Sequence, residues 1–282
     1  MSAQRTLQWY FALFMRRMPK WMRSRRTAIA AAAGVAAIFA GAVADFGEVF
    51  DRIIPGRSAA TSAELAALKD DLLKELRAQG ITIDATAKSA IGDALAYFDK
   101  VKDKRVERAK KLMTTAPPAE ALNLFKAVTE TLAQKLRGKD AAKAWAALGA
   151  IAYAVDSDLA IAAYERACEL DPDDADAHFS LASLLQDRAR LEEARVKYDK
   201  VIELARAQGD PALAALAAMN NGLIAKQQGK LDESEAALLG AVKSFEELRD
   251  DYDLAVAYLN LGVLYTVKAA LGAQGRYNPD AS

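Results

Sequence analysis

The sequence has almost none of the residues that build catalytic and metal centres. It contains one cysteine, Cys168, and one histidine, His178, among 282 residues. A single cysteine cannot form a disulfide within the chain. The scarcity of both residue types also removes most metal sites and the common nucleophile–histidine pairs. We therefore expect neither an enzyme nor a protein that holds a metal or a cofactor.

Helix breakers are scarce too, and so are strand patterns. Only 7 prolines and 15 glycines occur, and there are no alternating runs of Val, Ile and Thr. Apolar residues make up 52% of the chain, and many of them are alanine, which is a strong helix former. This composition predicts an all-α protein.

Negative charge is missing from the start of the chain. Residues 1–26 hold seven Arg or Lys residues and no Asp or Glu, although the net charge of the whole chain is zero. The other residues therefore carry 31 basic and 38 acidic side chains, and this mildly acidic balance argues against nucleic-acid binding. Aromatic residues such as Trp9 and Trp21 lie among the basic ones. That mixture is typical of a membrane–water interface, and a disordered basic tail is the alternative.

An uncharged stretch follows this basic segment. Thr27–Ala44 is eighteen residues long, at the lower end for a transmembrane helix, and an apolar stripe continues to Ile54. Because basic residues precede the span, the positive-inside rule places the N-terminus in the cytoplasm. We therefore expect a single-pass protein of a bacterial inner membrane, with the rest of the chain in the periplasm.

The same stretch also permits cleavage and export. Ala42-Val43-Ala44 fits a signal-peptidase site, and the sequence SRRTAI at 24–29 loosely resembles a twin-arginine signal. Cleavage after Ala44 would release the body as an exported soluble protein that binds a lipid or small molecule. A further alternative is a non-catalytic subunit of a larger membrane assembly. The sequence leaves these alternatives open.

Residues 55–83 have the pattern of a linker followed by an amphipathic helix. Pro55-Gly56 breaks the preceding helix, and Thr61–Glu64 matches a capping box. The helix after it places four leucines on one face, which are Leu65, Leu68, Leu72 and Leu76. This stripe predicts either packing on the body or a short coiled coil, which would make the protein a homo-oligomer through residues 64–78.

Three more helices are expected in residues 84–138. Their expected ranges are 84–100, 104–113 and 119–136, with Pro117-Pro118 between the last two. We expect these helices to stack on the part of the chain that follows, and to cover its exposed end.

That following part contains an internal repeat. Four segments carry small and aromatic residues in the same order, and the small residue in the middle of each is Gly149, Ala182, Gly222 and Gly262. The steps between them are 33, 40 and 40 residues, which indicates an array of helical repeats. A small residue at the middle of one helix lets a second helix cross it closely.

The signature residues resemble those of the tetratricopeptide repeat. The first unit carries them in the family's order, as Trp145, Leu148, Gly149, Ala160, Tyr164, Ala167 and Pro172. Asn221 departs from the pattern, because leucine is usual at its position. The resemblance covers residues 139–270 and implies three helical-hairpin units plus a capping first helix, stacked in a superhelix. Residues 271–282 are expected to form a disordered tail.

The resemblance also implies a function. In this family the concave wall, lined by the first helix of each unit, binds an extended peptide or a partner's helix. Asn220 and Asn260 stand where an asparagine holds the backbone of a bound peptide in similar repeats, and bonding to neighbouring helices is their alternative role. The expected groove is more apolar than charged, which favours a protein ligand with an apolar stripe. Its residues are Phe179, Ser183, Gln186, Met219, Asn220, Leu223, Lys226, Gln227, Leu259, Asn260 and Val263.

Two further features are interpreted as structural. The acidic run at 170–176 lacks the glycine and the distal glutamate of a calcium loop, so we expect an ordinary turn between repeats. Cys168 and His178 lie at positions where the repeat packs its helices, and we expect both side chains in the core.

Overall fold

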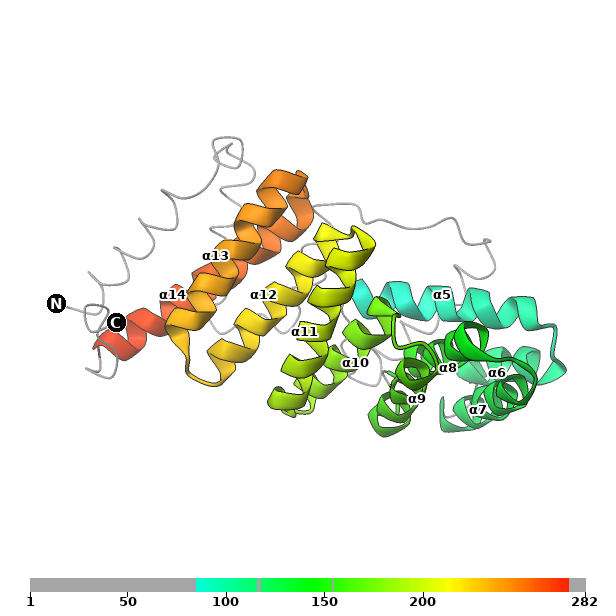
Figure 1. The fold of residues 1–282 in the computed structure, drawn as a ribbon. Helices are drawn as coiled ribbons and strands as arrows, with labels where there is room; N and C mark the ends of the chain where they lie inside the picture. Colours follow the sequence, from blue (N-terminus) through cyan, green and yellow to red (C-terminus); the bar gives the residue numbers. More distant parts are fainter. Residues whose placement is uncertain (1–84, 116–117, 154, 274–282) are drawn as a thin grey trace. The chain divides into compact units, whose positions relative to one another are not determined.

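The computed structural model describes residues 85–115, 118–153 and 155–273 of the chain (Figure 1). Every regular element in these ranges is an α-helix, which confirms the prediction of an all-α fold. The expected transmembrane span at 27–44 and the leucine stripe at 64–78 lie outside the described residues.

The described chain folds as two compact units. The first runs to Lys197, and the second begins at Tyr198, within helix α11. The helices of the first unit are α5 (Ala85–Val101), α6 (Lys104–Thr115), α7 (Pro118–Lys135), α8 (Gly138–Ala152), α9 (Ser157–Leu170), α10 (Ala175–Asp187) and the start of α11 (Leu191–Gln208). The second unit holds the rest of α11 with α12 (Pro211–Gln227), α13 (Leu231–Leu248) and α14 (Asp251–Ala273). Because α14 continues to Ala273, the expected tail is wrong over its first three residues, which are helical.

Aspartates at the helix starts define where the helices begin. In α9, α10, α12 and α14 the residue before the first turn is an aspartate whose carboxylate accepts a backbone N–H three residues later. The four pairs are Asp156 with Leu159 at 2.9 Å, Asp174 with Ala177 at 2.9 Å, Asp210 with Leu213 at 3.0 Å, and Asp250 with Asp253 at 3.2 Å. Each bond satisfies a donor that has no partner inside its own helix. One residue of the acidic run at 170–176, Asp174, therefore has a structural role as the N-terminal cap of α10.

In the first unit, the helices before the repeats stack on the first repeat. Both α5 and α7 pack against α8. The rings of Phe98 from α5 and Phe125 from α7 lie 4.8 Å apart between their centroids, and both side chains are fully buried. Apolar side chains of α5 and α7 thus meet beside α8.

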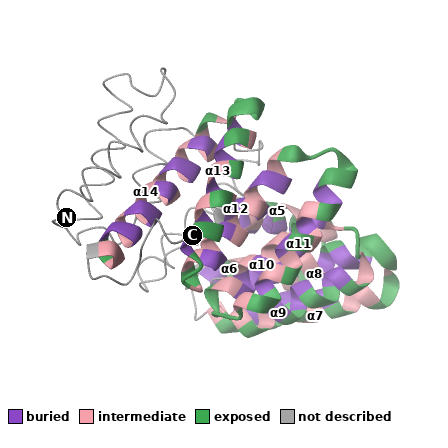
Figure 2. Ribbon diagram, turned by 60° about the vertical axis from the view of Figure 1, so that its left-hand side comes forward, coloured by how far each residue is buried: buried purple, intermediate pink, exposed green. Residues whose placement is uncertain are grey.

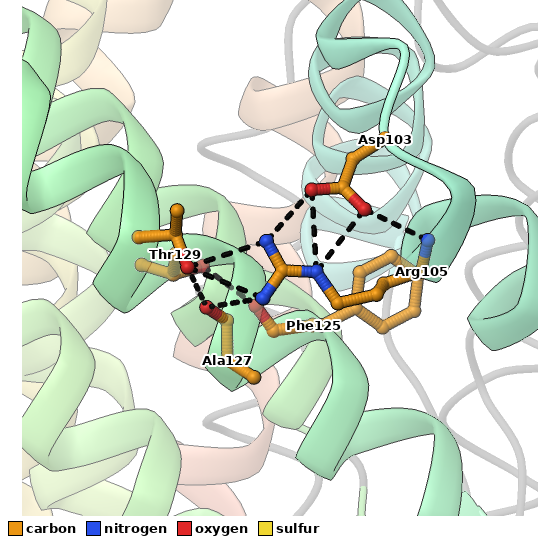
Figure 3. Close-up of polar contacts among 6 residues, drawn as sticks. Asp103, Arg105, Phe125, Ala127 and Thr129 are labelled. Atoms are coloured by element: carbon orange, nitrogen blue, oxygen red, sulfur yellow. Dashed lines mark hydrogen bonds and ion pairs between the residues drawn. The ribbon is translucent and has the colours of Figure 1, made fainter.

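A polar network joins the start of α6 to α7 (Figure 3). Asp103 caps α6 by accepting the backbone N–H of Arg105, and it also pairs with the Arg105 guanidinium at 2.7 Å. The same guanidinium donates to the carbonyl of Ala127 at 3.4 Å and to the hydroxyl of Thr131 at 3.2 Å. Hydrogen bonds from Arg105 lower the pKa of the Asp103 carboxyl. Because both side chains are partly exposed, this network orients α6 more than it stabilises the unit.

In the repeats formed by α8–α9 and α12–α13, the two helices cross at a glycine. At Gly149 in α8, a methyl group would lie 2.8 Å from the ring of Tyr164 in α9. At Gly222 in α12, it would lie 2.9 Å from the side chain of Ala237 and 3.4 Å from the backbone oxygen of Ser234, both in α13. Contacts under 3.0 Å are closer than packed carbon atoms tolerate. The small residues predicted from the repeat pattern are therefore required by the close approach of paired helices.

In the second unit, α13 packs between α12 and α14 through one hydrophobic cluster. Lys268 of α14 is buried as well, with 1% of its surface exposed. Its ammonium group donates to Asp232 and to Glu235 of α13, each at 2.6 Å, and the Tyr265 hydroxyl also donates to Glu235 at 2.7 Å. Two carboxylates thus compensate one buried cation, and they fix how α14 is placed on α13.

Helix α14 is unusually apolar. Among the described helices it alone is long and apolar enough, over Asp251–Gly272, to cross a membrane by length and composition. However, 44% of that stretch is buried inside the protein, and Figure 2 shows buried and intermediate residues along the length of α14. A core helix passes the same test of length and composition, and we interpret α14 as the last helix of the repeat array.

We predict that alanine at either crossing glycine destabilises the protein. Gly149→Ala forces a methyl group against the ring of Tyr164, and Gly222→Ala forces one against the methyl group of Ala237, so the free energy of unfolding should fall by about 1–3 kcal/mol in each case. Urea denaturation followed by circular dichroism measures this change.

The matched control is Gly240→Ala, because a methyl group at Gly240 meets no atom within 4 Å. That variant should gain stability through the higher helix propensity of alanine. Equal stabilisation by all three substitutions would show that the helices do not cross closely at Gly149 and Gly222.

Candidate functional site

In the second compact unit, α12 and α14 are each the first helix of a repeat. Both carry polar and apolar side chains at the positions predicted for the groove. In α12, Gly222 contacts α13, and Asn220 lies about 200° around the helix from it, so Asn220 points away from α13. Asn260 occupies the same register on α14, two residues before Gly262. We call the partly exposed side chains at the predicted positions on these helices the first-helix surface. It consists of Asn220, Leu223, Lys226, Gln227, Leu259, Asn260 and Val263, of which Gln227 is exposed and the others are half-buried.

Met219 does not belong to this surface, contrary to the sequence prediction. Its side chain is only 5% exposed and packs in the cluster that α12, α13 and α14 share. One residue along a helix is a turn of about 100°, which takes Met219 from the open side next to Asn220 into the core. A long unbranched side chain fills the irregular gap between helices well.

Asn220 and Asn260, the predicted ligand-binding asparagines, form no hydrogen bond to another described helix, whereas their neighbour Asn221 does. Asn220 makes no hydrogen bond with the described residues, although it is half-buried. Asn260 donates its amide to the carbonyl of Val256, one turn earlier in its own helix, at 3.1 Å. Asn221, in contrast, donates to Asp199 of α11 at 2.7 Å. The inter-helix role considered for the predicted pair is therefore performed by Asn221, the residue that departs from the repeat pattern.

Three predicted groove residues lie in the first unit, on α10. Phe179, Ser183 and Gln186 are all half-buried. The hydroxyl of Ser183 lies 3.5 Å from that of Tyr153, and Tyr153 donates to Asp187 at 2.9 Å. Tyr153 follows the last turn of α8, so these bonds tie the end of one first helix to the next. No sequence pattern marks Tyr153 or Asp187, because their bond joins residues 34 apart.

Lys226 is the one charged residue of the first-helix surface. It lies near the end of α12 and is half-buried, and burial lowers the pKa of its ammonium group. It takes part in no ion pair or hydrogen bond with the described residues. The surface therefore combines apolar side chains, three amides and a cation that lacks a counter-charge among the described residues.

Cys168 and His178 are both in the core, as predicted. Cys168 is 6% exposed, and burial raises the pKa of its thiol to about 11. His178 is also 6% exposed, and its Nε2 atom lies 3.2 Å from the carbonyl oxygen of Pro172. Within the described residues, no group of three or more His, Cys, Asp or Glu side chains is arranged to hold a metal ion.

Comparisons with known proteins agree with this architecture. A model of the family described as TPR repeat matches residues 157–188, which covers α9 and α10. Among solved structures, the chain is similar to the crystal structure of BtubC (BKLC) from P. vanneervenii, with a TM-score of 0.51 and 19% sequence identity. That likeness covers 77% of this chain and 87% of the other, and at this identity it concerns the fold. A comparison with curated proteins found no match.

We predict that Cys168 is unreactive in the folded protein. With a pKa of about 11, about one thiol in a thousand is ionised at pH 8, and burial excludes the reagent as well. Labelling with a disulfide reagent at pH 8 should be at least 100-fold slower in buffer than in 8 M urea. Equal rates under the two conditions would contradict the placement of Cys168 in the core.

Proposed function

We propose that this TPR-like helical-repeat protein is a binding scaffold that holds a peptide or a helix of a partner protein on its first-helix surface. TPR repeats generally mediate interactions between proteins, and residues 157–188 match that family. The observation that carries the proposal is Asn220, which is half-buried but makes no hydrogen bond with the described residues. Its amide is therefore available to donate to and accept from a bound peptide.

The chemistry of the surface supports a peptide ligand. A side-chain amide donates and accepts at once, which matches the N–H and C=O of a peptide group. Asn220 has both functions available toward a ligand, and Asn260 retains its carbonyl oxygen because only its NH₂ group bonds to Val256. Leu223, Leu259 and Val263 provide apolar contacts around the amides. This combination suits a segment with an apolar stripe, bound in part through its backbone.

We further propose that the scaffold is anchored in a membrane by the uncharged stretch at 27–44, with the repeats on the far side from the cytoplasm. The support is the stretch itself and the seven basic residues before it. The anchor would hold the partner-binding surface near the membrane. Export after cleavage at Ala44 is the competing proposal, because the same residues fit a signal peptide.

Two measurements separate anchoring from export. If the stretch is an anchor, the protein should remain in the membrane pellet after extraction with alkaline carbonate and should keep its basic N-terminal segment. N-terminal sequencing of the purified protein checks the second point. A mature chain that starts at Asp45 and appears in the soluble fraction would contradict the anchor.

We predict that lysine at both asparagine positions abolishes partner binding. In Asn220→Lys/Asn260→Lys, two long cations replace the amides, so they remove the peptide-matching groups and place charge on an apolar surface. Chemical cross-linking in cells, followed by affinity purification and mass spectrometry, should show at least a tenfold loss of the partners recovered with the wild type.

The matched control is Asn123→Lys/Gln134→Lys, which adds the same charge at two exposed positions of α7. It should retain the partners. Both double variants should unfold at similar temperatures, because all four positions lie outside the fully buried core. Unchanged recovery with the Asn220→Lys/Asn260→Lys variant would exclude the first-helix surface as the binding site.

A further inference from the structure

Lys226 occupies a position where an unpaired charge is costly. It follows Met219 of the shared hydrophobic cluster by seven residues and the partly buried Leu223 by three, so its side chain starts at the border between that cluster and the first-helix surface. Its side chain is half-buried there. An ammonium group that is partly removed from water and not paired destabilises the folded state, whereas a methionine of similar length would not.

The acidic residues of the unit do not compensate this charge. Helix α12 contains no Asp or Glu, and α14 has them only in its first turn, at Asp251 and Asp253. On α13, Asp232 and Glu235 both bind Lys268. The pKa of Lys226 is lowered by desolvation without an opposing contribution from any carboxylate.

Lys268 shows how this protein accommodates a buried lysine when the charge has a structural role. That ammonium group is almost completely buried and is bonded to two carboxylates at 2.6 Å. Lys226 on α12 and Lys268 on α14 each lie on the first helix of a repeat in the second unit. Lys268 is fully buried, and Lys226 is half-buried. The difference between them is that the described residues supply carboxylates to Lys268 and none to Lys226.

We propose that Lys226 pairs with a carboxylate side chain of the bound partner, whose apolar stripe packs on Leu223 and Val263. The proposal rests on the first-helix surface being the binding site, and it specifies the partner as an amphipathic segment with one Asp or Glu beside its apolar stripe. A charge-assisted hydrogen bond at a partly desolvated site is stronger than one in water. It also fixes the register of the segment, which apolar contacts alone do not.

Selection from a peptide library tests this specificity. A phage-displayed library of random 16-residue peptides is selected on the immobilised full-length protein in detergent, in wild-type, Lys226→Met and Lys243→Met forms. Lys243 is the control because it is an exposed lysine on α13, with 79% of its side chain accessible. Wild type and Lys243→Met should enrich peptides with an apolar stripe and an Asp or Glu at a constant distance from it. Lys226→Met should enrich peptides without that acid, or none.

The outcomes of the selection distinguish the proposed pairing of Lys226 with a carboxylate from the proposal that the first-helix surface is the binding site. Wild-type peptides that have an apolar stripe but no enriched acid would overturn the role of Lys226 and leave the first-helix surface as the binding site. Retention of the acid in selections on Lys226→Met would overturn it as well. If the wild type enriches no peptides, both proposals fail.

A selected peptide then gives a quantitative test. Its glutamate or aspartate, changed to the corresponding amide, should weaken binding to the wild type by at least tenfold and leave binding to Lys226→Met unaffected. Amidation of the peptide's C-terminus should change neither affinity, because the proposed partner group is a side chain. Lys226→Met should unfold at the same temperature as the wild type or higher, whereas a purely structural role for Lys226 would lower that temperature.

Discussion

The structure depends on how closely the two helices of each repeat approach each other. At Gly149 and Gly222 there is no space for even one methyl group between the paired helices. This contact determines which side of α8 and of α12 is covered by a second helix. The opposite side of α12 is then left partly exposed, and Asn220 lies on it because two residues correspond to slightly more than half a turn. The candidate binding surface is therefore a consequence of the glycine contact on the other side of the helix.

Polar groups in the second unit fall into two classes according to whether the fold provides their partners. Lys268 is bonded to Asp232 and Glu235, and Asn221 is bonded to Asp199. These groups hold α14 on α13 and α12 on α11. Asn220 and Lys226 have no such partners among the described residues, although both are partly removed from water. Because these groups can bond to a ligand without breaking a bond of the fold, the second class is where binding is expected. The apolar side chains between them provide contact area, and the two polar groups provide direction and register.

The sequence was a good guide to the helices and a weaker guide to the surface. Prolines and capping aspartates mark the helix ends locally, so the three helices before the repeats lie within two residues of their expected ranges. The glycine contacts were predicted for a similar reason, since the repeat pattern places a small residue in the middle of each first helix. Met219 was placed wrongly, because its burial depends on the apolar residues that α14 brings beside α12. No local pattern near Met219 or Asn221 carries that information.

The amino-acid sequence by itself determined the helical composition, the period of the array, the positions of its small residues and the core location of Cys168 and His178. These properties follow from residue size, helix propensity and spacing, which act over one or two turns. Only the tertiary structure decided which polar side chains bond to another helix. It gave Asn221 its bond to Asp199 and Lys268 its two carboxylates, and it left Asn220 and Lys226 without partners in the described chain. Those differences depend on residues from 22 to 36 positions away that packing brings together, and no rule of local sequence encodes them.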